Sequence, residues 1–210
     1  MNSNRDNREI VMLNIAVTGG IGSGKTSVTE IIRSYGYTVI DADAMSREIT
    51  SAGGKAIPYI REKFGPEFIM EDGSLNRAKM RDLVFRDPRK KALLEEGTTK
   101  VVLEDIETIR MQKEKAGEKA LFFDIPLLFE TGTEGDYDAV WVVTADYAVR
   151  AARIMERDGI DEGMIDLIMG SQEDDDVKTA KADLVICNNG SMEDLERAVE
   201  GAMASYGLTC

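Results

Sequence analysis

A glycine-rich run near the amino terminus constrains this chain more than any other stretch. Residues 19–26 read Gly-Gly-Ile-Gly-Ser-Gly-Lys-Thr, which fits the pattern of a glycine, any four residues, and then Gly-Lys-Ser/Thr. The apolar stretch 11–17 before it predicts a buried strand. Apolar residues then recur at helical spacing over 28–35, and Gly36 follows as a C-terminal cap. Strand, loop and helix in this order are typical of a Walker A loop.

Such a loop predicts binding of the phosphates of a nucleoside triphosphate. Glycines let the backbone turn around an anion with its N–H groups inward, and the following helix N-terminus adds a partial positive charge. Lys25 would reach the β- and γ-phosphates, and the Thr26 hydroxyl would ligate Mg²⁺. The alternative interpretation is a glycine-rich turn with a solvated lysine, which the flanking strand and helix disfavour.

Composition limits the partners that the chain can have. With 210 residues we expect one α/β domain with insertions, and 43% hydrophobic and 31% charged residues are ordinary for a soluble globular protein. The formal net charge of −13 disfavours a nucleic-acid partner, although a local pocket can still bind a small polyphosphate. Because the chain has no histidine, acid–base chemistry must fall to Asp, Glu, Lys or Tyr.

The termini and cysteines suggest a location. Residues 1–10 lack an apolar core, so we interpret 1–11 as a disordered leader and not as a signal peptide. No run reaches the length of a membrane span, and we expect no membrane partner. Cys187 and Cys210 show neither a pairing pattern nor metal-ligand spacing, which predicts a cytoplasmic protein. No obligate protein partner is evident from the sequence.

Two carboxylates follow a second predicted strand, 37–40. If the chain stays extended, Asp41 and Asp43 face the same side, at the carboxyl edge of an α/β sheet where ligands bind. A carboxylate there could accept the proton of an attacking hydroxyl or help to hold the metal. The alternative is that Asp43 merely caps a helix that begins at Ala44.

Residues 44–116 have a helical pattern throughout, which is far too long for an ordinary βαβ connection. We expect a helical insertion that holds a second substrate over the phosphates, the alternative being a merely structural cap. Gly97, inside one of these helices, costs about 1 kcal/mol relative to Ala and predicts a kink or break.

The second half of the chain supplies three more apolar runs, 120–124, 139–144 and 184–187, which predict strands. The first ends at Asp124 in the form of a Walker B strand, whose Asp helps to hold Mg²⁺. Arginines at intervals of three and four then share one side of a predicted helix and could neutralise a transferring phosphoryl group, or could form an ordinary solvated face. They are Arg150, Arg153 and Arg157.

Three adjacent acidic residues, 174–176, are interpreted as exposed to water and not as a metal site, because neighbouring side chains point in different directions. A turn signature at 188–190 precedes a last predicted helix. Ser191 and Asp194 suggest its cap, and its inward residues would be Leu195, Val199, Ala202, Met203 and Tyr206.

Taken together, the motifs closely resemble those of dephospho-coenzyme A kinases, which are P-loop enzymes of the nucleotide-kinase type. The matching pieces occur in the family's order between about residue 12 and residue 205. They are 18–26, 39–43, 72–77, 124–130, 153–157, Gln172, and Ala182-Asp183 leading to Asn188 and Gly190.

This resemblance implies a three-layer α/β P-loop fold with a mostly parallel five-stranded sheet. The nucleotide-binding core would comprise 12–43, 118–149 and 183–208, the acceptor-binding helical insertion 44–117, and the lid 150–182. The implied reaction transfers the γ-phosphoryl group of ATP, with Mg²⁺, to the ribose 3′-hydroxyl of dephospho-coenzyme A, the last step of coenzyme A synthesis.

The resemblance also implies roles for individual residues. Asp43 would be the base, Lys25 and Arg153 would act on the phosphates, and Asn188 would lie near the adenine of ATP. Arg47 and Arg77 would contact charged groups of the acceptor. The implied nucleotide-binding residues are Gly20, Ile21, Gly22, Ser23, Gly24, Lys25, Thr26, Ser27, Arg157 and Asn188; the acceptor-binding residues are Asp41, Asp43, Arg47, Arg77 and Leu127; and the metal ligands are Thr26 and Asp124.

The chain departs from the family pattern at two places. Thr26-Ser27 replaces the usual Ser-Thr, and either hydroxyl can ligate Mg²⁺. Thr99-Lys100 replaces the usual His-Pro in the insertion, which bears on the shape of the acceptor site. The alternatives are therefore a P-loop kinase of another small acceptor and a catalytically silent nucleotide-binding regulator. A GTPase is disfavoured because 180–183 lacks the first residue of the guanine-reading motif.

Overall fold

The computed structural model describes residues 12–208, which form two compact units. One unit comprises the chain up to Ile40 and from Lys113 onward, and the other comprises Asp41–Gln112. The predicted leader, 1–11, and Cys210 lie outside the described residues. None of the helices in the described range combines the length and apolar character that crossing a membrane requires.

A five-stranded sheet with the order β2-β3-β1-β4-β5 is the centre of the first unit. The pairs β1–β3, β1–β4 and β4–β5 are all parallel. The register places Val17 of β1 beside Asp124 of β3 and Trp141 of β4. This arrangement confirms the predicted α/β fold class. The strands are β1 (Leu13–Thr18), β2 (Thr38–Asp41), β3 (Ala120–Asp124), β4 (Ala139–Thr144) and β5 (Leu184–Cys187).

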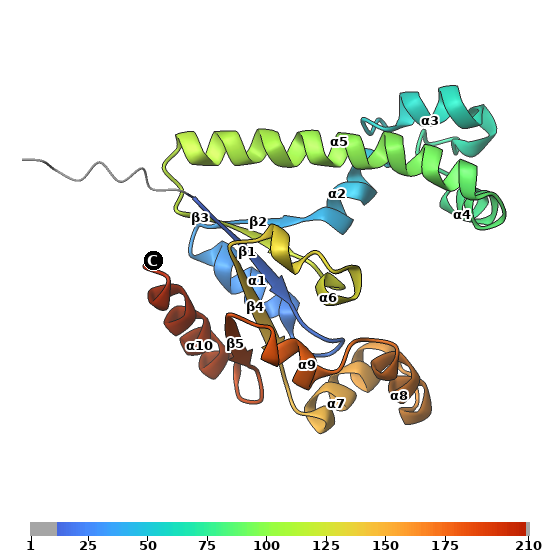
Figure 1. The fold of residues 1–210 in the computed structure, drawn as a ribbon. Coiled ribbons are helices and arrows are strands. Elements are labelled where there is room, and N and C mark those ends of the chain that lie inside the picture. The colour runs from blue at the N-terminus through green and yellow to red at the C-terminus, as the bar shows by residue number, and fades with distance from the viewer. Residues whose placement is uncertain (1–11, 209–210) are drawn as a thin grey trace, which may run out of the picture. The chain divides into compact units, whose positions relative to one another are not determined.

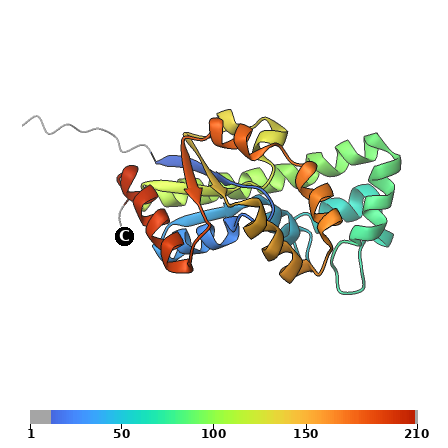
Figure 2. The ribbon, with the colours of Figure 1, turned by 90° about the horizontal axis from the view of Figure 1, so that it is seen from below.

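Helices cover both faces of this sheet, because alternate strand residues point to opposite sides. Ile15, Phe122 and Trp141 pack with α1 (Lys25–Ser34) and α10 (Met192–Ser205), which lie side by side in Figures 1 and 2. Ala16, Val140 and Val142 pack on the other face with α6 (Leu128–Thr131). The remaining elements of this unit are η2 (Glu134–Asp136), α7 (Tyr147–Asp158), α8 (Glu162–Gly170) and α9 (Asp175–Ala180).

The last helix forms as its sequence predicts. Ser191 accepts from the Asp194 N–H, and the Asp194 side chain accepts in return from the Ser191 N–H, which completes a capping box. Four of the five predicted inward residues are buried: Leu195, Val199, Ala202 and Met203. Tyr206 follows the helix and packs partly buried against Trp141, with ring centroids 5.4 Å apart.

The second unit is helical, as predicted, but not without interruption. A short 3₁₀ helix and an isolated bridge between Ile69 and Leu75 separate its first two helices from the rest. Its core gathers apolar side chains such as Ile60, Phe64 and Met80. The elements are α2 (Ala42–Ile49), α3 (Ile57–Phe64), η1 (Pro66–Phe68), α4 (Arg77–Arg86) and α5 (Pro88–Lys115), the last running past the boundary of the unit.

The end of β2 differs from the prediction. The strand stops at Asp41, and α2 begins at Ala42, so the expected alternation of two extended carboxylates is wrong. Asp41 is the N-cap of α2, and its Oδ1 accepts from the Ala44 N–H at 2.8 Å. Asp43, which we considered as the cap, lies in the first helical turn, where its side chain is exposed and its negative charge is favourable to the helix.

Gly97 does not break its helix, contrary to our expectation, because α5 is continuous from Pro88 to Lys115. The glycine is buried beneath the ring of Tyr59, which occupies the space that a Cβ would need. The Tyr59 hydroxyl donates to the Leu93 carbonyl at 2.8 Å and so holds the ring in place. Close approach of α3 and α5 therefore explains this glycine.

Gly97→Ala should lower the free energy of unfolding by up to about 2 kcal/mol, even though Ala is the better helix former. Overpacking against the fixed Tyr59 ring costs about 1–3 kcal/mol, whereas helix propensity returns about 1 kcal/mol. Calorimetric unfolding would measure the change. In a Tyr59→Leu background the same substitution should be neutral or stabilising, and a loss of equal size there would contradict the steric explanation.

Candidate active site

The loop 19–26 joins β1 directly to α1, as predicted. Gly22 and Gly24 adopt φ angles of 78° and 89°, a region that favours glycine. Gly24 precedes α1 without any side-chain cap, so the first N–H groups of the helix are left to an anion. The backbone thus has the form of a phosphate-binding turn.

Close packing behind the loop explains why side chains are excluded from it. A Cβ at Gly19 would collide with the Val143 carbonyl, and one at Gly24 would collide with the Asn188 amide nitrogen. Both obstructing groups come from the sheet side of the first unit, at the ends of β4 and β5. The loop therefore rests on the carboxyl edge of the sheet, where ligands bind in open α/β folds.

A cavity of about 540 Å³ opens over the loop, which is within the usual size range of small-molecule sites. Its lining includes most of the predicted nucleotide-binding residues, from Gly20 to Thr26, together with Arg153 and Arg157. Pro126 and Gln172 complete the wall on the side of the segments that follow β3 and α8. The structure thus brings together residues from four separate parts of the sequence.

Lys25 and Asp124 meet inside this site. The Lys25 ammonium donates to Asp124 Oδ1, and the two side chains are only 15% and 10% exposed. Within residues 12–208 no group of three or more acidic or cysteine side chains gathers in a way that could hold a metal. Mg²⁺ commonly binds through one or two protein oxygens plus substrate phosphates, so the Asp124 carboxylate and the Thr26 hydroxyl suit such a mode.

The three arginines of α7 have different surroundings. The Arg150 side chain is 8% exposed, which excludes a solvated role for it. Arg153 lies against the loop, where its Nη2 donates to the Asn188 carbonyl at 3.1 Å and its Nη1 approaches the Gly22 carbonyl at 3.4 Å. Arg157 is 62% exposed and pairs with Asp158, whose carboxyl pKa it holds below the usual value.

Asn188 is buried at the end of β5 and supports the loop from behind. Its Nδ2 donates to the Ser23 carbonyl at 2.8 Å, and its own N–H continues the sheet pattern by donating to the Thr144 carbonyl at 2.8 Å. The family resemblance implied a position near the adenine of ATP for this residue. The structure shows it as a support of the phosphate loop, and a contact with adenine remains a prediction.

Comparison with known proteins decides the family. A sequence model described as dephospho-CoA kinase matches residues 13–194. The chain belongs to the dephospho-CoA kinase family. The dephospho-CoA kinase of Corynebacterium glutamicum is 39% identical over 193 residues, which cover 92% of this chain and 99% of the relative. The predicted family and the kinase activity class are thereby confirmed.

Solved structures agree with this assignment to the dephospho-CoA kinases. The dephospho-CoA kinase from Campylobacter jejuni is 25% identical, with a TM-score of 0.65 over 92% of this chain and 96% of that chain. A Thermus thermophilus protein is 32% identical, with a TM-score of 0.73 over 92% of this chain and 97% of that chain. Use of a nucleoside triphosphate follows from the P-loop kinase family.

Three contacts near this kinase site were not predicted from the sequence. Asp175, which we expected to meet only water, forms an ion pair with Arg150. Asp174 caps α9 by accepting from the Asp176 N–H at 2.8 Å. Lys178, three residues after Asp175, is 1% exposed, and its Nζ lies 3.4 Å from Glu130 Oε1. The acidic run was visible in the sequence, but the partners of Asp175 and Lys178 were not, because they lie far away along the chain.

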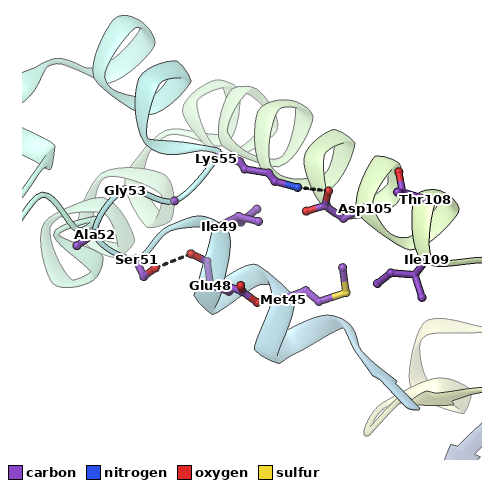
Figure 3. A pocket seen from close by; sticks show the side chains of 11 residues that line it. Met45, Glu48, Ile49, Ser51, Ala52, Gly53, Lys55, Asp105, Thr108 and Ile109 are labelled. Atoms are coloured by element: carbon purple, nitrogen blue, oxygen red, sulfur yellow. Dashed lines mark hydrogen bonds and ion pairs between the residues drawn. The ribbon is translucent and has the colours of Figure 1, made fainter. Parts of the chain in front are cut away.

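Two of the cavities in the second unit of the kinase are lined by residues of α2. One, of about 510 Å³, is lined by Arg47 and Arg77, and the Arg77 guanidinium donates to the Arg47 carbonyl at 3.2 Å. The other, of about 580 Å³, lies between α2 and α5. Figure 3 shows Lys55 reaching from the loop after α2 to pair with Asp105 of α5 at its rim. This second cavity contains none of the predicted site residues.

The two cavities lie on different faces of α2. Asp43 and Arg47 are four residues apart on α2 and share a face, whereas Met45, Glu48 and Ile49, which line the second cavity, lie around the helix from Asp43. The cavity with Arg47 and Arg77 is therefore on the side of α2 that presents Asp43.

Leu127, the predicted acceptor-binding residue of the first unit, comes directly before α6. Its side chain is 48% exposed.

Proposed function

We propose that the protein transfers the γ-phosphoryl group of ATP to the ribose 3′-hydroxyl of dephospho-coenzyme A. The observation that carries the proposal is the match to the dephospho-CoA kinase family over residues 13–194. This range includes the Walker loop, in which the Lys25 ammonium donates a hydrogen bond to Asp124. The relative from Corynebacterium glutamicum bears the same name over nearly its whole length. Both substrates would be bound by residues of this chain.

The nucleotide end of the proposed mechanism rests on the first unit. The N–H groups of the loop and of the first turn of α1 would bind the phosphates, and the Lys25 ammonium would move from Asp124 to the β- and γ-phosphates when ATP enters. Arg153, whose Nη1 lies 3.4 Å from the Gly22 carbonyl and 3.5 Å from the Ser23 carbonyl, would turn toward the charge that develops on the transferring group. Arg157 and Ser27 complete the proposed contacts.

Magnesium is part of this proposal. Thr26 at the start of α1 and Asp124 at the end of β3 are the residues that would hold it. When bound, Mg²⁺ neutralises charge on the phosphates and keeps the donor and the acceptor oxygens in line. Asp124 is 7% exposed and offers its second carboxylate oxygen beside the one that accepts from Lys25.

The acceptor end rests on α2 and α4. Asp43 would accept the proton of the 3′-hydroxyl, since it follows the carboxyl end of β2, a strand of the sheet that carries the Walker loop. Arg47 and Arg77 would pair with the diphosphate of the acceptor in the cavity that they line. Asp41 would set the direction of α2 through its cap, and Leu127 would contact the acceptor from the first unit.

The proposed division of labour extends to whole segments. Residues 44–117 would bind the acceptor, 150–182 would close over ATP, and 12–43, 118–149 and 183–208 would form the nucleotide-binding core. We also propose a cytoplasmic location, which the exposed free thiol of Cys187 favours. The net charge of −13 argues against a nucleic-acid partner.

The direct test is to incubate the protein with MgATP and dephospho-coenzyme A and to follow ADP and coenzyme A by chromatography. We expect ATP-dependent formation of coenzyme A in equal amount to ADP, and no product when EDTA removes the metal. Failure to form coenzyme A where another dephospho-CoA kinase succeeds would overturn the proposal. A panel of other hydroxyl acceptors would then identify another substrate, and ATP binding without any turnover would indicate a silent regulator.

A further inference from the structure

A single residue of the Walker loop, Ile21, is held at both its backbone N–H and its backbone carbonyl by side chains from outside the loop. Its N–H donates to Gln172 Oε1 at 2.9 Å, and the Ile21 carbonyl accepts from Arg150 Nε at 2.9 Å. We propose that Gln172 and Arg150 are positioning residues that hold the loop in its phosphate-binding shape before the nucleotide arrives. The inference rests on the nucleotide-binding part of the proposed function and is independent of the acceptor.

Arg150 is fixed on its far side as well. Its Nη1 pairs with Asp175 Oδ2, and the Asp175 side chain is 32% exposed against 8% for that of Arg150. The guanidinium thus joins the loop to the start of α9, and it also fills the space beside Gly20 where a Cβ would be. A planar guanidinium can serve two acceptors in fixed directions, which the point charge of a lysine cannot do.

The segment that carries Gln172 and Asp175 is itself anchored. Glu130 of α6 accepts from the Glu173 N–H at 2.9 Å through Oε1, and the buried Lys178 of α9 approaches the same oxygen at 3.4 Å. Residues 172–178 therefore form a strap, bonded to the loop at one end and to α6 at the other. An anchored strap can transmit rigidity to the loop that it touches.

The backbone N–H groups of the loop have two different roles, one in holding the loop and the others in binding phosphate. The Ile21 N–H is committed to Gln172, so phosphate binding falls to the N–H groups that follow, from Gly22 to the first turn of α1. Holding the backbone on both sides of Ile21 reduces the conformational entropy that this glycine-rich loop must lose on binding ATP. Removing the support should therefore weaken ATP binding without a direct loss of any phosphate contact.

The test measures the dissociation constant of MgATP by titration calorimetry, together with KM for each substrate, in Gln172→Met and Arg150→Met variants. We expect each variant to bind MgATP about three- to tenfold more weakly, as the loss of one hydrogen bond predicts. KM for the acceptor should stay unchanged. Because the two side chains hold the adjacent peptide groups on either side of Ile21, the double variant should lose less than the product of the two single losses.

Controls separate positioning from general stability. Gln112→Met changes an exposed glutamine of α5, and Arg197→Met removes an arginine that is 70% exposed on α10, so neither should alter MgATP affinity. Arg150→Lys keeps a positive charge beside Asp175 but loses the planar, forked guanidinium group. This variant should therefore bind MgATP more weakly than the wild type. If Arg150→Met does not fold, Gln172→Met alone decides the question.

Unchanged MgATP affinity in folded Gln172→Met and Arg150→Lys variants, even with lowered melting temperatures, would overturn the proposal and leave these residues a structural role only. Weakened MgATP binding that the control variants share would overturn it too. Because the readout is binding of ATP, a protein that phosphorylates another acceptor would still give the expected result. Failure of the positioning proposal and failure of the proposed reaction are therefore distinguishable.

Discussion

Asp43→Asn should lower kcat by at least about 10²-fold while leaving the affinity for MgATP close to that of the wild type. General-base catalysis typically contributes about 10²- to 10⁴-fold, and the amide of Asn cannot accept the proton of the attacking hydroxyl. Since Asp43 is exposed on α2, the substitution should not disturb the core. Steady-state kinetics with saturating dephospho-coenzyme A, together with calorimetric titration of MgATP, would measure both quantities.

The matched control is Glu48→Gln, which removes one negative charge from an exposed residue of the same helix. Glu48 lines the cavity that contains none of the predicted site residues, so kcat should change by less than about threefold. Equal losses of kcat in the two variants would show that the reaction depends on the local negative charge and that Asp43 does not act as a base. A loss of less than about fivefold in Asp43→Asn would remove this residue from the base role.

The sequence predicted most of what surrounds the phosphates, because those features are local. A glycine loop between an apolar strand and an amphipathic helix is determined by residues within about fifteen positions, and the strands at 120–124, 139–144 and 184–187 match β3, β4 and β5. Gly24 needs both its backbone angle and its contact with Asn188, but the motif alone already required a glycine there. Local pattern and tertiary packing thus agree at the loop.

Predictions that depended on the exact end of an element were less successful. Asp41 and Asp43 were placed on one extended face, but the capping bond of Asp41 to the Ala44 N–H begins the helix earlier. Gly97 was interpreted from its helix propensity alone, whereas the Tyr59 ring that requires it comes from a helix about forty residues earlier. In both cases a specific contact outweighed a statistical preference.

Long-range polar pairs could not be predicted at all. Arg150 belongs to a row of arginines that helical spacing identifies, but nothing in the sequence distinguishes it from Arg157, which is exposed. The difference arises because Asp175 reaches Arg150 only after the chain has passed through α8 and turned back. The same applies to Lys178, whose helix looks hydrophilic although it packs against β4.

The ion pair of Glu130 and Lys178 leads to a second large effect, on stability. Glu130→Gln should lower the free energy of unfolding by about 2–4 kcal/mol, because it leaves the ammonium of Lys178 buried without a counter-charge. Lys178 is 1% exposed, and among residues 12–208 its Nζ has no hydrogen-bond partner that could replace the carboxylate. Urea unfolding followed by the fluorescence of Trp141, which is fully buried, would measure the change.

The matched control replaces the other partner of the ion pair. Lys178→Met removes the buried charge and leaves Glu130, which is 22% exposed and keeps the hydrogen bond from the Glu173 N–H, so the loss should be below about 1 kcal/mol. The double variant should regain most of the stability lost in Glu130→Gln. Equal losses in the two single variants would contradict this asymmetry and would mean that the pair contributes through attraction alone.

The dependence on pH provides an independent check on the same pair. Burial is the largest single influence on the pKa of Glu130, and it raises that pKa. The backbone N–H groups of Glu173 and Glu130 and the positive charge of Lys178 lower it, and together they outweigh burial. The pKa of Glu130 therefore lies below its ordinary value of 4.5. The carboxylate therefore stabilises the fold fully above about pH 4.5, and this contribution is lost as pH falls through the lowered pKa. The stability difference between the wild type and Glu130→Gln should accordingly narrow below pH 4.5, and a constant difference down to pH 3 would show that the ion pair is not its source.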